Sequence, residues 1–123
     1  MLENRVFLGF LTTLGLTLSS LEAGSLGSLL FHGNCIACHK EVKAVSAPSV
    51  MEFRLNYLRA FAQKEDFVEY MSKWVEHPNT ESSIMKDAIK KYEIMPELGF
   101  EKSTLKIISE YIYETDFSKE HEE

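Results

Sequence analysis

Cys35-Ile36-Ala37-Cys38-His39 is the most informative stretch of this sequence. Two cysteines three positions apart on a helical turn project from the same face, so both sulfurs can reach one edge of a bound group. The next residue, His39, then presents an imidazole nitrogen to a metal ion held in that group. This spacing is typical of covalent attachment of c-type haem through both cysteines, with the histidine bound to the iron. The sequence therefore predicts one covalent haem c.

Three other interpretations of the two cysteines were weighed against haem attachment. A thioredoxin-like redox pair uses the same spacing on a βαβ scaffold, but no strand pattern precedes this stretch. A zinc site needs four ligands, and the remaining histidines, His32, His77 and His121, are not arranged as a ligand pair. Two incidental thiols stay open as a third alternative. Haem attachment is favoured over all three.

A second axial ligand to the iron is expected from Met95, which lies in Glu93-Ile94-Met95-Pro96 between two expected helices. Histidine and methionine together are a known ligand pair for haem iron. Pro96 stiffens the backbone directly after the methionine and prevents a helix from including it. We therefore assign the iron to His39 and Met95.

Other residues could take the place of Met95. Met71 and Met85 fall in expected helical apolar stripes, where core packing is the simpler explanation. His77 is the first reserve, because two histidines can also ligate haem iron. Met51 is the second reserve, although it lies close to His39 in the sequence.

The composition fits one compact all-α domain. The chain has 123 residues, of which 45% are hydrophobic, and no stretch shows the alternation of a strand. Apolar spacing predicts helices from about Gly27 to the cysteines, over 53–61, over 67–75 and over 81–92, with a last helix capped by Ser103. The net charge of −6 argues against nucleic acid as a partner.

The first 23 residues resemble a secretory signal peptide. An uncharged run of 16 residues, from 6 to 21, precedes an expected cleavage site after Ala23. An uncleaved membrane anchor is the alternative, although a spanning helix needs about 20 residues. We expect a domain over 24–123 that is exported to the periplasm, and membrane-tethered there only if cleavage does not occur.

Over about residues 24 to 117 the sequence resembles the class I cytochromes c, in particular small monohaem cytochromes of the bacterial periplasm. The resemblance rests on Gly27 and Phe31, the Cys35 to His39 motif, Ala47-Pro48-Ser49, Trp74 with Pro78, Met95-Pro96, and Leu105 with Tyr111. It implies the cytochrome c fold, with about four to five short helices around the haem and with the first and last helices crossing.

The resemblance also implies roles for individual residues. Gly27 would permit the close approach of the two crossing helices, and Phe31 would pack against Leu105 and Tyr111. Pro48 would offer its carbonyl to the second ring nitrogen of His39. The indole N–H of Trp74 would meet a haem propionate, although an ordinary core tryptophan is the alternative.

An iron bound on both sides by protein has no open position for a substrate, so the prediction is an electron carrier and not an enzyme. We expect it to pass single electrons between a donor and an acceptor redox protein, in transient contacts. Two rivals stay open. One is a haem-based enzyme or gas sensor with an open sixth position, and the other is a membrane-tethered cytochrome subunit of a larger oxidoreductase.

Overall fold

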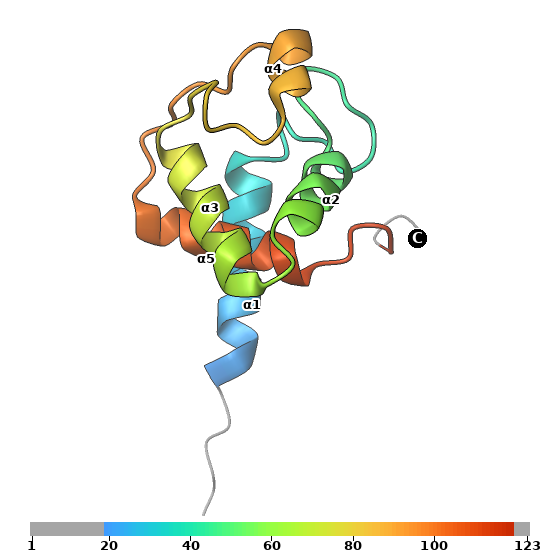
Figure 1. The fold of residues 1–123 in the computed structure, drawn as a ribbon. Helices are drawn as coiled ribbons and strands as arrows, with labels where there is room; N and C mark the ends of the chain where they lie inside the picture. Colours follow the sequence, from blue (N-terminus) through green and yellow to red (C-terminus); the bar gives the residue numbers. More distant parts are fainter. Residues whose placement is uncertain (1–18, 120–123) are drawn as a thin grey trace, which may run out of the picture.

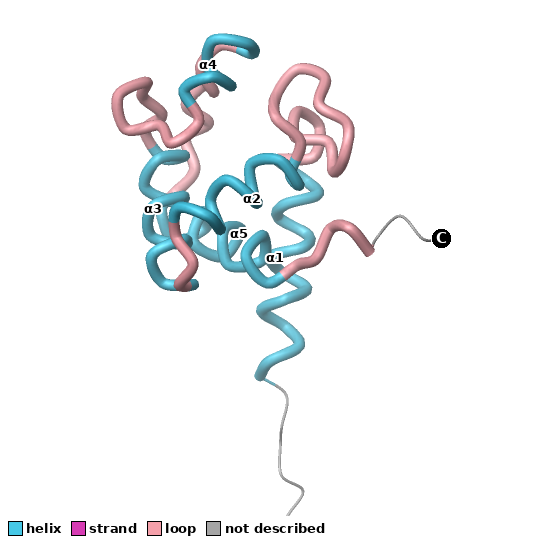
Figure 2. The backbone as a smooth tube through the Cα atoms, turned by 45° about the vertical axis from the view of Figure 1, so that its right-hand side comes forward, coloured by secondary structure: helices cyan, strands magenta, loops and turns pink. Residues whose placement is uncertain are grey.

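The computed structural model describes residues 19–119, and within that range it contains helices and loops but no strand (Figures 1 and 2). The helices are α1 (Ser19–Asn34), α2 (Val50–Ala60), α3 (Lys64–Glu76), α4 (Lys86–Tyr92) and α5 (Lys102–Glu114). The predicted all-α class is therefore confirmed. Among the residues described, no helix combines the length and the apolar character needed to cross a membrane.

The helix boundaries differ from the predicted ones; α2 and α3, for example, each begin three residues earlier than predicted. Helix α1 begins at Ser19, ahead of the expected cleavage site, and residues 1–18 of the expected signal peptide lie outside the described range. Helix α5 begins at Lys102 after Glu101, so the prediction of Ser103 as its N-cap is wrong. The backbone N–H of Leu105 already donates to the carbonyl of Glu101 at 3.1 Å, so helical hydrogen bonding starts two residues before the predicted cap.

Helix α4 is also shorter than predicted, because it begins at Lys86 and not near residue 81. The preceding residues form turns that side chains stabilise: the Asn79 side-chain oxygen accepts from the Ser82 N–H at 2.9 Å, and the Ser83 hydroxyl accepts from the Met85 N–H at 3.0 Å. Such local bonds offer the backbone an alternative to a helix. The predicted helical apolar stripe through Met85 is therefore wrong.

Helix α5 is the centre of the packing, because it crosses both α1 and α3 (Figures 1 and 2). The α1 crossing has no room for a side chain at Gly27, where a Cβ would lie 2.6 Å from the Cβ of Tyr111. Next to it, the ring centroids of Phe31 and Tyr111 are 5.6 Å apart, as the resemblance implied for this pair. Phe117, beyond the end of α5, completes this aromatic cluster at 5.5 Å from Phe31.

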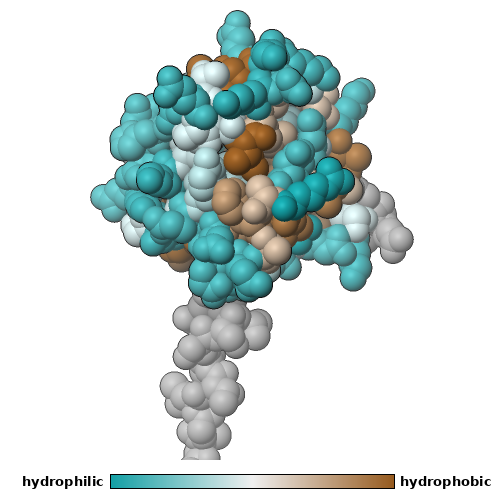
Figure 3. Space-filling view, viewed as in Figure 1, coloured by the Kyte–Doolittle hydropathy of each residue, from teal (hydrophilic) through white to brown (hydrophobic). Residues whose placement is uncertain are grey.

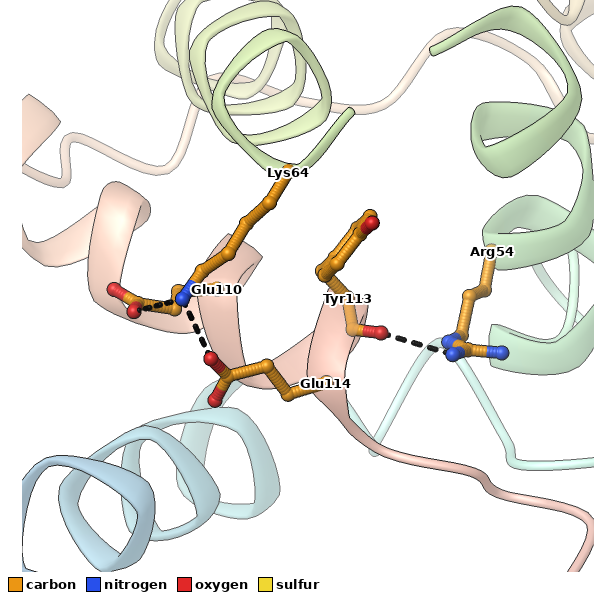
Figure 4. A network of polar contacts seen from close by, with 5 residues as sticks. All are labelled: Arg54, Lys64, Glu110, Tyr113 and Glu114. Atoms are coloured by element: carbon orange, nitrogen blue, oxygen red, sulfur yellow. Dashed lines mark hydrogen bonds and ion pairs between the residues drawn. The ribbon is translucent and has the colours of Figure 1, made fainter. Parts of the chain in front are cut away.

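Polar contacts fasten the outer helices to α5 (Figure 4). Arg54 of α2 donates to the carbonyls of Ile112 and Tyr113, at 2.7 and 2.9 Å. Lys64, the first residue of α3, reaches both Glu110 and Glu114 at 2.6 and 2.5 Å. These contacts hold α2 and α3 against α5, and so they fix the walls of the space enclosed between the helices.

Candidate haem-binding site

An apolar cavity lies between the helices, with about 910 Å³ of space that protein atoms do not fill, part of it open to solvent. All five helices or the loops next to them contribute to its wall, for example through Phe31, Tyr57, Trp74, Ile89 and Ile108. Its lining consists mainly of apolar side chains with a few polar groups, which is the pattern of sites for cofactors and other small molecules. Figure 3 shows apolar surface gathered in the middle of one face and framed by hydrophilic residues.

The cavity brings together five of the six predicted site residues. Cys35, His39 and Met95 all line it, although the methionine is far from the other two in the sequence. Pro48 and Trp74 line it as well, whereas Cys38 does not. The tertiary structure therefore places around one cavity residues that lie far apart in the sequence.

His39 is held in one orientation by its neighbours. Its Nδ1 lies 2.8 Å from the carbonyl oxygen of Pro48, and its ring meets the Phe53 ring edge-on, with centroids 5.0 Å apart. A carbonyl only accepts hydrogen bonds, so Nδ1 carries the proton and donates it, which leaves the lone pair on Nε2. A hydrogen bond of this kind fixes the tautomer of a ligating histidine and makes it more basic.

Burial lowers the pKa of His39 below its ordinary value of 6.5, and the hydrogen bond to Pro48 opposes this effect without cancelling it. The imidazole is therefore neutral at physiological pH. Neutral imidazole is the form that binds metals. The neutral protonation state and the free lone pair on Nε2 thus both suit an axial ligand.

The two cysteines lie in the turn that continues α1. The N–H of Cys35 donates to the carbonyl of Phe31, and the N–H of His39 donates to the carbonyl of Cys35, each at 2.8 Å. Both thiols are free, with Cys35 half-buried at the cavity and Cys38 exposed. This hydrogen-bonded turn includes both cysteines and His39, as the spacing of the motif predicts.

The structure bears on the alternatives for these cysteines. Burial, assisted by the nearby Cys38, raises the pKa of the Cys35 thiol to about 11. A reactive redox pair needs a depressed thiol pKa, so this environment disfavours that interpretation. In residues 19–119 no group of three or more histidine, cysteine, aspartate or glutamate side chains is placed to hold a metal ion.

Met95 is half-buried and lies in the loop between α4 and α5. The reserve candidates are placed differently. His77 does not line the cavity; its side chain is 73% exposed and its Nδ1 donates to Glu97 at 2.6 Å. Met51 packs against the core and does not line the cavity either. Met71 and Met85 do line it, so both become rivals to Met95, although the sequence favoured core packing for each.

Trp74 makes a contact that differs from the one implied by the resemblance. Its indole N–H donates to the carbonyl of Asn79 at 3.0 Å. A bond from this indole to a haem propionate stays a prediction, and it would require the N–H to change partner. The carbonyl of Pro48, by contrast, is bonded to His39 as the resemblance implied.

One feature of the site was not predicted from the sequence. Glu93, two residues before Met95, has φ 70° and ψ 172°, a combination that is essentially restricted to glycine and costs about 1–3 kcal/mol in other residues. Gly99, at the other end of the same loop, has φ 74°. No sequence pattern signals a glutamate in this conformation, because only the surrounding fold imposes it.

The residues present fit a covalently bound haem. The thiol of Cys35, the imidazole of His39 and the thioether of Met95 belong to residues that line one apolar cavity, and the exposed thiol of Cys38 lies in the same turn as Cys35. Comparison of the chain with protein-family models, with curated proteins and with solved structures gives no match.

Proposed function

We propose that this chain is a monohaem c-type cytochrome that carries single electrons between two redox proteins. The observation that carries the proposal is that Cys35, His39 and Met95 border one apolar cavity, with Nδ1 of His39 held by the Pro48 carbonyl. A bound haem would supply one-electron oxidation and reduction, which the side chains of the protein do not provide.

Each residue has a distinct role in this proposal. Cys35 and Cys38 would hold the cofactor covalently, and His39 would bind the iron through Nε2. Met95 would be its second protein ligand, and with both ligands bound a substrate would have no open position on the iron. The apolar wall would exclude water, and a low-polarity environment together with a methionine ligand favours a comparatively high reduction potential.

The proposed setting is the periplasm, with a donor and an acceptor that bind only briefly. The chain carries a net charge of −6, so contacts with such partners should weaken as salt rises. Transient redox contacts typically bury less than about 1,200 Å² in total. Attachment to a membrane through an uncleaved N-terminus is the alternative, and the mass of the native protein would distinguish the two.

The experiment is expression with export in a host that has c-type maturation machinery. We expect a mass increase of one haem that survives denaturation and solvent extraction, and its loss in the double variant Cys35→Ser/Cys38→Ser. Protein that retains no haem after extraction would overturn the proposal.

The second ligand is tested on the same material. We expect a low-spin ferric spectrum with the absorption band of a methionine sulfur bound to iron, which Met95→Ala removes and the matched variant Met85→Ala keeps. The reverse result would move the ligand to Met85. A high-spin spectrum with ready binding of carbon monoxide to the reduced protein would instead favour an enzyme or a gas sensor.

A further inference from the structure

The loop that carries Met95 is fixed at a point before the methionine and at a point after it. Before it stands Glu93, the only residue other than glycine with a positive φ in the part of the chain that the structure describes. Its φ of 70° and ψ of 172° are strained for a residue with a side chain. This conformation turns the chain sharply as it leaves α4.

The point after the methionine is Glu97. Its carboxylate accepts a hydrogen bond from Nδ1 of His77 at 2.6 Å, and His77 directly follows the last residue of α3. Both side chains are largely exposed, at 73% and 59%. An exposed side-chain contact of this kind adds little to the stability of a fold. What this one does is tie the loop to α3 two residues beyond Met95.

A strained backbone persists only where the surroundings determine it. Around Glu93 those surroundings are few, because α4 has no buried residue and Ile94 and Leu98 are 41% and 47% exposed. Of this loop, Glu93, Met95, Leu98 and Phe100 line the cavity, and Met95 is the half-buried one among the residues directly after the turn. The strained backbone at Glu93 is therefore coupled to the position of Met95, which follows it by two residues in the same loop.

We propose that the backbone turn at Glu93 and the His77–Glu97 contact act as a pair of positioning elements that hold Met95 toward the cavity and set how firmly it binds the haem iron. This inference rests on the proposed function. It assigns a role to a strained glutamate and to a histidine that the sequence analysis considered only as a ligand.

The test is a set of substitutions at position 93 in the haem-loaded protein, with imidazole as a competing ligand for ferric iron. Glu93→Gln removes the charge but still places a residue with a side chain at a positive φ, so it is the reference. Glu93→Gly also removes the backbone strain, because glycine adopts a positive φ readily, and it should keep the methionine band. Glu93→Val makes the turn harder to adopt, because the side chain is β-branched. We expect its apparent affinity for imidazole to rise about tenfold over the Gln variant, with weakening of the methionine band.

The His77–Glu97 contact is tested without changing the backbone turn at Glu93. His77→Gln and Glu97→Gln should each raise imidazole affinity by about 2- to 5-fold, and the double variant should add little, because both remove one contact. These positions are exposed, so the variants should fold even if Glu93→Val does not. Far-ultraviolet circular dichroism checks that every variant keeps its helices.

The possible outcomes separate the two proposals. Wild-type protein without covalent haem overturns the proposed function, and the inference with it. Wild-type protein with covalent haem and a low-spin spectrum, but with a methionine band that is absent or that survives Met95→Ala, overturns the inference and leaves the proposal of a haem-bearing electron carrier standing. The inference is also overturned if the wild-type band depends on Met95 but imidazole affinity does not change in either comparison. These comparisons are Glu93→Val against Glu93→Gln, and the His77 and Glu97 variants against wild type.

Discussion

Gly27 of α1 lies directly against Tyr111 of α5, so that a Cβ on the glycine would stand 2.6 Å from the Cβ of the tyrosine and 3.2 Å from the carbonyl oxygen of Ile107. Neither atom belongs to the far end of a flexible side chain, so neither can move aside cheaply. The absence of a side chain at position 27 is therefore what allows α1 and α5 to cross at this distance. The same crossing places Phe31 in the core and the cysteine turn at the cavity.

A methyl group at this position should separate the two helices. We predict that Gly27→Ala destabilises the protein by about 1–3 kcal/mol, the usual cost of overpacking. Gly33→Ala is the matched control in the same helix, because a Cβ there meets nothing within 4 Å. It should raise stability by up to about 1 kcal/mol, since alanine favours a helix over glycine. Urea denaturation measures both, and equal stabilities would contradict the contact at Gly27.

The contact of Arg54 with α5 should contribute to stability more than an ordinary surface arginine does. Its guanidinium satisfies the carbonyls of Ile112 and Tyr113 in the last turn of the helix, which lack helical partners. We predict a loss of about 1.5–3 kcal/mol for Arg54→Met, the range for hydrogen bonds from charged groups. Arg59→Met, at an exposed position of the same helix, should change stability by less than about 0.5 kcal/mol. Similar losses at the two positions would show that the contact adds nothing specific.

Acid should weaken the link between α3 and α5. Hydrogen bonds from Lys102 and then Lys106, at 2.7 and 3.1 Å, lower the pKa of Glu69 below its ordinary value of 4.5. The unfolded chain therefore takes up this proton more readily than the folded one. The stabilisation is complete above the ordinary value and disappears as pH falls through the lowered pKa of the folded state.

The measurement is the difference in unfolding free energy between wild type and Glu69→Gln along a pH series. It should be positive at neutral pH and shrink toward zero on acidification below about 4.5, and added salt should reduce it. Glu65→Gln, at an exposed position in the same helix, provides the control. A difference that does not depend on pH would exclude the ionic contact as its source.

The two thiols should differ in reactivity in protein made without haem. Because the pKa of Cys35 is raised to about 11, on the order of 0.1% of it is thiolate at pH 8, and its side chain is half-buried. We predict that iodoacetamide modifies the exposed Cys38 well before Cys35, and that the rates converge in urea. Peptide mapping by mass spectrometry over time measures the order, and faster reaction at Cys35 would show that its surroundings are not those described.

The sequence analysis succeeded where the signal is local. The periodic apolar positions of 67–75 predicted α3, and the cysteine–histidine spacing predicted the helical turn in which Cys35, Cys38 and His39 lie. It failed at Met85, because side-chain hydrogen bonds of the preceding loop replaced the expected helical turn. It also gave no sign of Phe117, whose burial depends on the α1–α5 crossing and not on any periodicity of its own.

The order of residues alone was enough to indicate an all-helical chain with its chemistry concentrated at Cys35 to His39, because both properties depend on neighbours within one or two helical turns. Packing decided the rest: that Met95 and Met85 share a cavity with His39 while His77 and Met51 do not, and that Glu93 adopts a glycine-like backbone. These features depend on contacts between residues far apart in the chain. Which distant surfaces meet depends on how the core packs around Gly27 and α5.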